Sequence, residues 1–173
     1  MSGRLVALLG AECTGKSTLA EALAREFNAG LVGEYLREWC DTHGRTPLQH
    51  EQAHIAATQA ARIEAAAQAH AVVICDTTPL ITALCSQHYF DDDTLTPEAL
   101  AFQRRCDLTL VCAPDLPWEP DGFLRDGPTV RARFDARLRA ALADAELPAT
   151  DVHGPWPARL QAARRAMAAL LAA

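Results

Sequence analysis

The sequence is short of positive charge. It has sixteen lysine and arginine residues against twenty-two aspartate and glutamate residues, which gives a formal net charge of -6. Proteins that bind nucleic acid generally gather positive charge to neutralise phosphates. We therefore expect no nucleic-acid partner, and we expect any phosphate that the protein binds to be held by a local site.

Long apolar runs and paired cysteines are also missing. No stretch approaches the roughly 18 apolar residues of a membrane span, and the short apolar run at residues 5–9 is too brief for a signal peptide. No two cysteines form a C-x-x-C pair, so we expect reduced, mostly structural thiols. These absences predict a soluble, cytoplasmic protein without a membrane anchor. The six thiols belong to Cys13, Cys40, Cys75, Cys85, Cys106 and Cys112.

Short apolar runs alternate with segments of helical periodicity. Runs of this length, apolar throughout, are typical of parallel strands covered on both faces, and the alternation predicts the α/β class. At 173 residues the chain fits one domain, residues 1–173. The expected strands are residues 5–9, 30–33, 71–75, 108–112 and 149–152. Two expected helices are residues 16–27 and 47–68, and the polar residues of the second, Gln49, Gln52, Gln59 and Arg62, leave an apolar stripe. A third expected helix runs through Val130 and Leu142, and a fourth begins at Pro157.

One glycine-rich motif follows the first expected strand and precedes the first expected helix. Residues 10–17 match the P-loop pattern G-x-x-x-x-G-K-[ST] in full. Its backbone N–H groups and the positive end of the following helix favour phosphates. The alternative is a glycine-rich turn without a ligand. The motif predicts an ATP and Mg²⁺ site, with nucleotide contacts from Gly10, Glu12, Cys13, Thr14, Gly15, Lys16, Ser17 and Thr18.

Lys16 is the only lysine of the chain, although fifteen arginines are present. A compact ammonium fits a phosphate cradle where the wide, planar guanidinium does not. We expect Lys16 to reach the terminal phosphates as a catalytic residue and Ser17 to bind the magnesium ion.

Two acids follow expected strands. Asp76 ends a buried apolar run, which places its carboxylate at the sheet edge where open α/β folds bind ligands. Its alternative role is a helix cap. Glu34 begins the cluster Glu34-Tyr35-Leu36-Arg37-Glu38, whose alternative is a solvated first turn of a helix. Either acid fits a general base for a hydroxyl acceptor, and Asp76 also fits a metal ligand.

A proline-, aspartate- and glycine-rich stretch at residues 114–128 follows the fourth expected strand and fits a lid. An arginine on a closing loop stabilises the charge of a phosphoryl transition state. We expect Arg125 in that role, with both catalytic and nucleotide contacts, and Arg131 as second choice. The remaining arginines of the next helix, Arg133, Arg137 and Arg139, fit a solvated face.

In these blocks the chain resembles the ribosylnicotinamide (nicotinamide riboside) kinase domain of NadR-type proteins. The resemblance rests on residues 10–17, the Glu34 cluster, Asp76-Thr77 with Thr82 and Tyr89, and Trp118 to Arg125. It implies a P-loop kinase fold with a five-stranded parallel sheet, helices on both faces and an arginine-bearing lid. It further implies phosphorylation of the ribose 5′-hydroxyl of nicotinamide riboside in NAD biosynthesis. By position, Glu34, Tyr35, Arg37 and Asp76 would line the acceptor site.

The chain departs from that family pattern at two positions. Gly33 stands where NadR-type kinases carry an aromatic residue that stacks on the nicotinamide ring, and Thr78 stands where they carry a second acid. Tyr35, Trp39 or Tyr89 offers a substitute aromatic wall, with core packing as the alternative for each. The adenylyltransferase and DNA-binding domains fused in some relatives have no room in 173 residues, so neither activity is expected.

Two functions from different classes fit these residues. The first is a kinase that acts on a nucleoside such as nicotinamide riboside. The second is a nucleotide-dependent regulatory ATPase or switch without a small-molecule acceptor. A conventional GTPase is disfavoured, because a chain whose sole lysine lies in the P-loop has no Asn-Lys-x-Asp motif. The sequence gives no oligomeric state.

Overall fold

Five parallel strands form the central sheet of the computed structural model, which describes residues 3–120 and 127–173. The strand order is β2-β3-β1-β4-β5, and every neighbouring pair is parallel. The predicted α/β class and the five predicted strands are confirmed. The strands are β1 (Arg4–Leu9), β2 (Gly30–Val32), β3 (Val72–Asp76), β4 (Leu108–Cys112) and β5 (Thr150–Val152).

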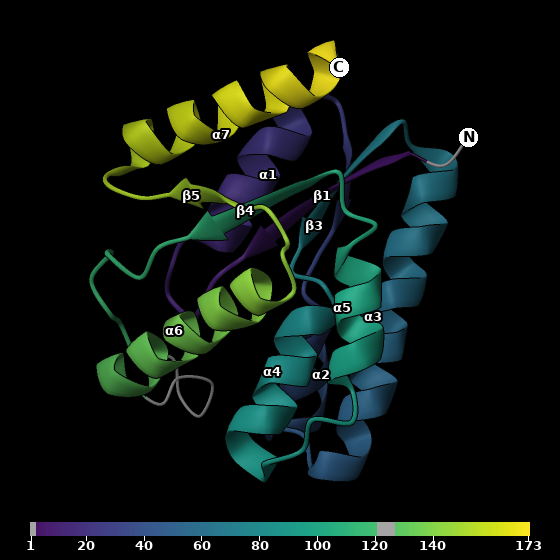
Figure 1. The fold of residues 1–173 in the computed structure, drawn as a ribbon, viewed down its shortest axis with the longest axis vertical. Coiled ribbons are helices and arrows are strands. Elements are labelled where there is room, and N and C mark those ends of the chain that lie inside the picture. Colours follow the sequence, from purple (N-terminus) through teal and green to yellow (C-terminus); the bar gives the residue numbers. More distant parts are fainter. Residues whose placement is uncertain (1–2, 121–126) are drawn as a thin grey trace.

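Helices connect the strands and cover both faces of the sheet (Figure 1). Four of them match the predicted helices to within two residues at most ends. The four are α1 (Lys16–Glu26), α3 (Gln49–Ala69), α6 (Pro128–Asp144) and α7 (Trp156–Ala172), and the described residues also form α2 (Tyr35–His43), α4 (Pro79–Phe90) and α5 (Thr96–Gln103).

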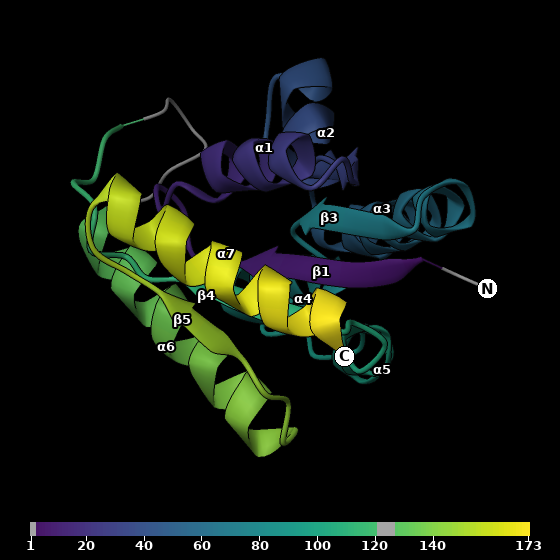
Figure 2. The same ribbon diagram turned by 90° about the horizontal axis from the view of Figure 1, so that it is seen from above.

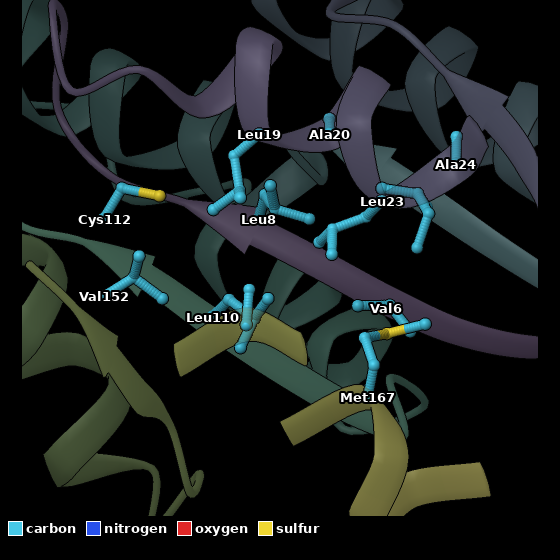
Figure 3. Close-up of a cluster of buried hydrophobic side chains, with 12 residues drawn as sticks. Val6, Leu8, Leu19, Ala20, Leu23, Ala24, Leu110, Cys112, Val152 and Met167 are labelled. Atoms are coloured by element: carbon cyan, nitrogen blue, oxygen red, sulfur yellow. The ribbon is translucent and has the colours of Figure 1, made fainter. Parts of the chain in front are cut away.

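Alternate residues of each strand face opposite helical layers. Val6 and Leu8 of β1 pack against α1 and α7, together with Leu110 and Met167 (Figure 3). Ala7 and Leu9 face the opposite layer, where α4, α5 and α6 pack. Figure 2 shows α1 on one side of β1 and α5 and α6 on the other. Because both faces are covered, the central strands β1, β3 and β4 are mainly apolar.

The helices α2, α4 and α5 were not predicted as separate elements. Six consecutive residues of α4, from Pro79 to Leu84, are buried, so the helix has no polar face and no 3.6-residue periodicity. The sequence does contain a signal for the start of this helix, because Thr78 caps it and Pro79 occupies its first turn. Helix α2 begins at Tyr35 with Glu34 as its N-cap, so the Glu34 cluster does form the first turn of a helix.

Two polar residues of α3 contradict the predicted apolar stripe, because Gln52 and Gln59 lie on its buried face, each 2% exposed. The Gln59 amide bridges two loops. Its Nε2 donates to the carbonyls of Gly33 and Thr77, and its Oε1 accepts from the Tyr35 N–H at 2.8 Å. Gln59 therefore fixes the loops that carry Glu34 and Asp76.

The six cysteines are free thiols, as predicted. Burial raises the pKa of Cys40 and of Cys112 to about 11, so both thiols are protonated at neutral pH. Among the helices of the described residues, none combines the length and apolarity that a bilayer span requires.

Candidate functional site

The P-loop joins the end of β1 to the start of α1. Gly10 has a φ of +150°, and a Cβ there would lie 2.7 Å from the Cys112 carbonyl oxygen. Gly15 has a φ of +75° at the N-cap of α1, where no side chain caps the helix. The first N–H groups of α1 are therefore available to an anion, and the helix dipole favours negative charge there.

Side chains of the P-loop bond within the loop itself. The Lys16 ammonium donates to the Ala11 carbonyl at 2.8 Å, and the Thr14 hydroxyl donates to the same oxygen at 2.9 Å. Thr14 is buried, whereas Ser17 and Thr18 are exposed. The Lys16 ammonium thus lies at the P-loop, and its contact with phosphates stays a prediction.

A cavity of about 720 Å³ opens beside the P-loop. The loop, the Glu34 cluster, α3, α4 and α6 all contribute to its walls. Its polar lining includes every nucleotide-contact residue predicted within the P-loop, together with Glu34, Arg37, Gln52 and Arg131. Its apolar lining includes Leu36, Cys40, Pro47, Ile81, Cys85, Tyr89, Phe90, Val130 and Phe134.

A second, smaller cavity of about 430 Å³ brings the two predicted acids together. Glu34 and Asp76 line it with Ser17, the predicted magnesium ligand. Asp76 is 5% exposed, and its Oδ1 has no hydrogen-bond partner in the described part of the chain. A hydroxyl and a carboxylate are the oxygen ligands that Mg²⁺ accepts, so the residues present fit this ion. Ser17, Glu34 and Arg37 line both cavities.

Charges around Glu34 act in opposite directions. Burial raises the pKa of the Glu34 carboxyl, and the neighbouring charge of Asp76 adds to the rise. Lys16 and Arg37 oppose it, Lys16 more strongly. A carboxyl whose pKa is raised by burial is a better proton acceptor than an exposed one once it has ionised.

One buried arginine connects the loops around the site. No pattern in the sequence indicated this role. Arg159 of α7 is 2% exposed. Its guanidinium donates to the carbonyls of Thr14 at 3.0 Å, Ala113 at 3.1 Å and Gly154 at 2.7 Å. It also pairs with Asp115, which accepts from the Gly154 N–H. Arg159 therefore joins the P-loop, the start of the 114–128 stretch and the loop before α7.

The described part of the predicted lid contacts the P-loop. The Trp118 indole N–H donates to the Glu12 carboxylate at 2.8 Å, and the Cys13 thiol donates to the Pro117 carbonyl at 3.4 Å. Arg131, the second choice for the lid arginine, lines the larger cavity and donates to the Leu116 carbonyl. Arg125, the first choice, lies outside the described residues, so its role stays a prediction.

The candidate aromatic residues occupy different places. Tyr89 lines the larger of the two cavities described above, whereas Tyr35 and Trp39 line neither of these two. Trp39 is buried and stacks on His43. The ring of Tyr35 lies under the Arg62 guanidinium and edge-on to His54, so the predicted acceptor contact of Tyr35 has no support from the cavity geometry.

The two departures from the resemblance have structural explanations. The Thr78 hydroxyl donates to the buried amide of Gln103 at 2.7 Å, and that amide donates to Thr109. Thr78 is fully buried within this neutral network, where an ionised acid would lack a partner. Gly33 faces open space, because a Cβ there would meet nothing within 4 Å.

Comparisons with known proteins give both a family and similar folds. The family model described as "AAA domain" matches residues 5–159. The trifunctional NAD biosynthesis/regulator protein NadR of Salmonella typhimurium is 33% identical over 132 residues, which are 73% of this chain and 32% of the relative. The chain thus spans about a third of that relative's length.

Solved structures of similar fold include two complexes of a NadR protein. The complex with NAD and AMP-PNP has a TM-score of 0.78 at 23% identity, over 99% of this chain and 50% of the other. The complex with NR has a TM-score of 0.73 at 24% identity, over 89% and 44%. A deoxyadenosine kinase from M. mycoides has a TM-score of 0.67 at 14% identity, over 98% and 100%. At these identities the likeness shows the fold, that of P-loop kinases.

Replacing Arg159 tests whether it organises the phosphate-binding loop. Arg159→Met leaves three carbonyls and Asp115 without their donor, so we expect the free energy of unfolding to fall by about 3 kcal/mol. We also expect the dissociation constant for AMP-PNP to rise at a temperature where the variant is folded. Urea denaturation and calorimetric titration measure the two effects.

The matched control is Arg164→Met on the same helix. Arg164 is exposed and pairs with Glu26 at 2.8 Å, so its loss is expected to cost less than about 1 kcal/mol and to leave AMP-PNP binding unchanged. Equal effects of the two variants would contradict an organising role for Arg159.

Proposed function

The chain belongs to the AAA domain family, and from this premise we propose that it is an ATP- and Mg²⁺-dependent kinase for a small-molecule acceptor. One observation carries the proposal. The P-loop, Glu34 and Arg37 line a cavity that extends over an apolar wall, and Asp76 lies in the adjoining cavity with Ser17. A hydrolase that only cleaves ATP has no need of such a space, whereas a kinase needs room for an acceptor beside the phosphates.

The residues of the chain divide the work of phosphoryl transfer. The N–H groups at the start of α1 and the Lys16 ammonium would bind the phosphates, and Ser17 and Asp76 would hold the magnesium ion. Bound Mg²⁺ neutralises charge that develops on the transferred group. Glu34 or Asp76 would accept the proton of the acceptor hydroxyl, and Arg37 would orient the acceptor. Arg125 would act from the lid, or Arg131 would act from the first turn of α6.

Nicotinamide riboside or a related nucleoside is the acceptor that we propose, with phosphorylation at its ribose 5′-hydroxyl as a step of NAD biosynthesis. Three findings support this choice. The relative at 33% identity is a NAD biosynthesis protein, a similar fold was solved with NR, and another is a deoxyadenosine kinase. The apolar wall with Tyr89 at its rim suits a flat heterocycle. Gly33 provides no ring of its own.

The proposal predicts acceptor-dependent use of ATP. With ATP and Mg²⁺, a panel of nucleosides that includes nicotinamide riboside is expected to yield a phosphorylated product, detected by mass spectrometry. Lys16→Ala is expected to keep its circular dichroism spectrum and to lose turnover to background. Slow ATP hydrolysis that no nucleoside accelerates would contradict the proposal and favour a regulatory ATPase.

The raised pKa of Glu34 predicts a pH dependence of stability with a definite sign. Because its folded-state pKa lies above the usual value of 4.5, the carboxyl stabilises the fold at low pH, and this contribution is lost as pH rises through the folded pKa. Glu34→Gln, which cannot ionise, is therefore expected to gain stability relative to the wild type over the pH range above 4.5. Urea denaturation across this range measures the difference.

The same titration should appear in catalysis. If ionised Glu34 contacts the acceptor, kcat/KM falls as pH drops through the raised pKa, and Glu34→Gln loses this acidic limb together with most of its activity. Glu21→Gln, on the exposed side of α1, is the control and is expected to change neither profile. A stability difference for Glu34→Gln that does not vary with pH would contradict the assignment.

A further inference from the structure

Gln52 is a buried polar residue whose carbonyl group is left without a partner. It lies in the first turns of α3, is 2% exposed and lines the larger cavity. Its Oε1 has no hydrogen-bond partner in the part of the chain that the structure describes. Gln59, two turns further along the same helix and equally buried, has both ends of its amide bonded to backbone groups.

The contrast between the two glutamines separates a structural role from a ligand-binding one. Buried amides in folded proteins are almost always hydrogen-bonded, and an unpaired one costs stability. Gln59 supports the Gly33 and Thr77 loops, whereas Gln52 supports no backbone group with its Oε1. A leucine at position 52 would fill a similar volume without that cost. The unpaired Oε1 of Gln52 therefore indicates a hydrogen-bond donor on a ligand that binds in the cavity.

The neighbours of Gln52 describe that partner. Leu36, Ile81, Phe90 and Phe134 line the same cavity and offer apolar contact to a flat ring. Glu34 and Arg37, also in its lining, suit the hydroxyls of a sugar. The amide of Gln52 adds one hydrogen-bonding position within this largely apolar region. The matching ligand is a nucleoside whose flat base carries an exocyclic N–H donor, and the carboxamide of the proposed acceptor, nicotinamide riboside, supplies one.

We propose that Gln52 determines acceptor specificity by hydrogen-bonding the exocyclic amide of the acceptor's base. The inference rests on the proposed kinase function and deepens it. The Gln52 Oε1 accepts an N–H of the amide, so a base that lacks this group leaves Oε1 unpaired in the complex. A site built to pair with a polar group discriminates strongly against an analogue without it.

The test compares Gln52→Leu with the wild type on two acceptors, nicotinamide riboside and the pyridinium riboside that lacks the carboxamide. For nicotinamide riboside, kcat/KM is expected to fall about tenfold or more, mainly through KM. For the analogue it is expected to change less than about threefold, so the preference for the carboxamide collapses. Gln68→Leu, an exposed position of the same helix, is the control and should leave both values unchanged.

The stability of the acceptor-free protein distinguishes a ligand-binding role of Gln52 from a structural one. If Gln52 were structural, its replacement would lower the stability. The urea midpoint of Gln52→Leu is expected to equal or exceed that of the wild type, because an unpaired buried acceptor is removed. A lower midpoint, or an equal loss of kcat/KM on both acceptors, would overturn the role of Gln52 alone. A wild-type enzyme that phosphorylates neither nucleoside would overturn the proposed function as well.

Discussion

The candidate site is built around one buried ionisable group, Asp76 at the edge of the sheet, whose Oδ1 has no hydrogen-bond partner among the described residues. Asp76 is the last residue of β3 and lies opposite Leu8 of β1 in the parallel register. The P-loop leaves β1 just beyond that pair, which brings the carboxylate and Ser17 to the same cavity. A buried carboxylate without full pairing costs free energy, which the apolar core on both faces of the sheet offsets. Such a cost is typical of a site that awaits a ligand.

Structural support for this edge comes from parts of the chain that are distant in sequence. The Gln59 amide holds the loops after β2 and β3, and the Arg159 guanidinium holds the P-loop and the loop after β4. Each side chain satisfies several backbone groups at once, so the loops are fixed without secondary structure of their own. The Thr78 hydroxyl closes a neutral network beneath the same edge. The site is therefore rigid where it would hold phosphate and open where it would hold an acceptor.

Much of the fold could be predicted from the sequence, because parallel strands that are covered on both faces form short apolar runs. The strands β1, β3 and β4 follow from such runs, and the helices α1, α3, α6 and α7 follow from 3.6-residue periodicity. Helix α4 was not predicted, because burial on several sides removes the 3.6-residue periodicity of apolar residues. Helix α5 was not predicted because it is only eight residues long. The P-loop and the acids at strand ends were legible because motif and position coincide. That Glu34 and Asp76 line one cavity was inferable from their positions after neighbouring parallel strands.

The contributions of Arg159, Gln52 and Gln59 to the candidate site could not be predicted from the sequence. On the sequence, Arg159 is one arginine of an amphipathic helix, and the two glutamines belong to an alanine-rich helix whose polar face was expected to be solvated. Their burial depends on how α3 and α7 pack, which no local pattern encodes. The acceptor contact of Tyr35 stays a prediction that rests on its position in the chain, and its ring packs against His54 and Arg62.

The central claim, that the buried Asp76 carboxylate is retained for a magnesium–nucleotide ligand at a cost in stability, is tested by unfolding Asp76→Asn in urea with and without Mg²⁺ and AMP-PNP. The account predicts that Asp76→Asn is more stable than the wild type without ligand and gains less stability when ligand is added. Asp135→Asn is the control, because Asp135 is also buried and its Oδ1 likewise lacks a partner among the described residues, but its Oδ2 pairs with Arg139 at 2.8 Å and it lines neither cavity. It should lose stability and keep the full response to ligand. An Asp76→Asn variant that is destabilised without ligand and responds like the wild type would contradict the account.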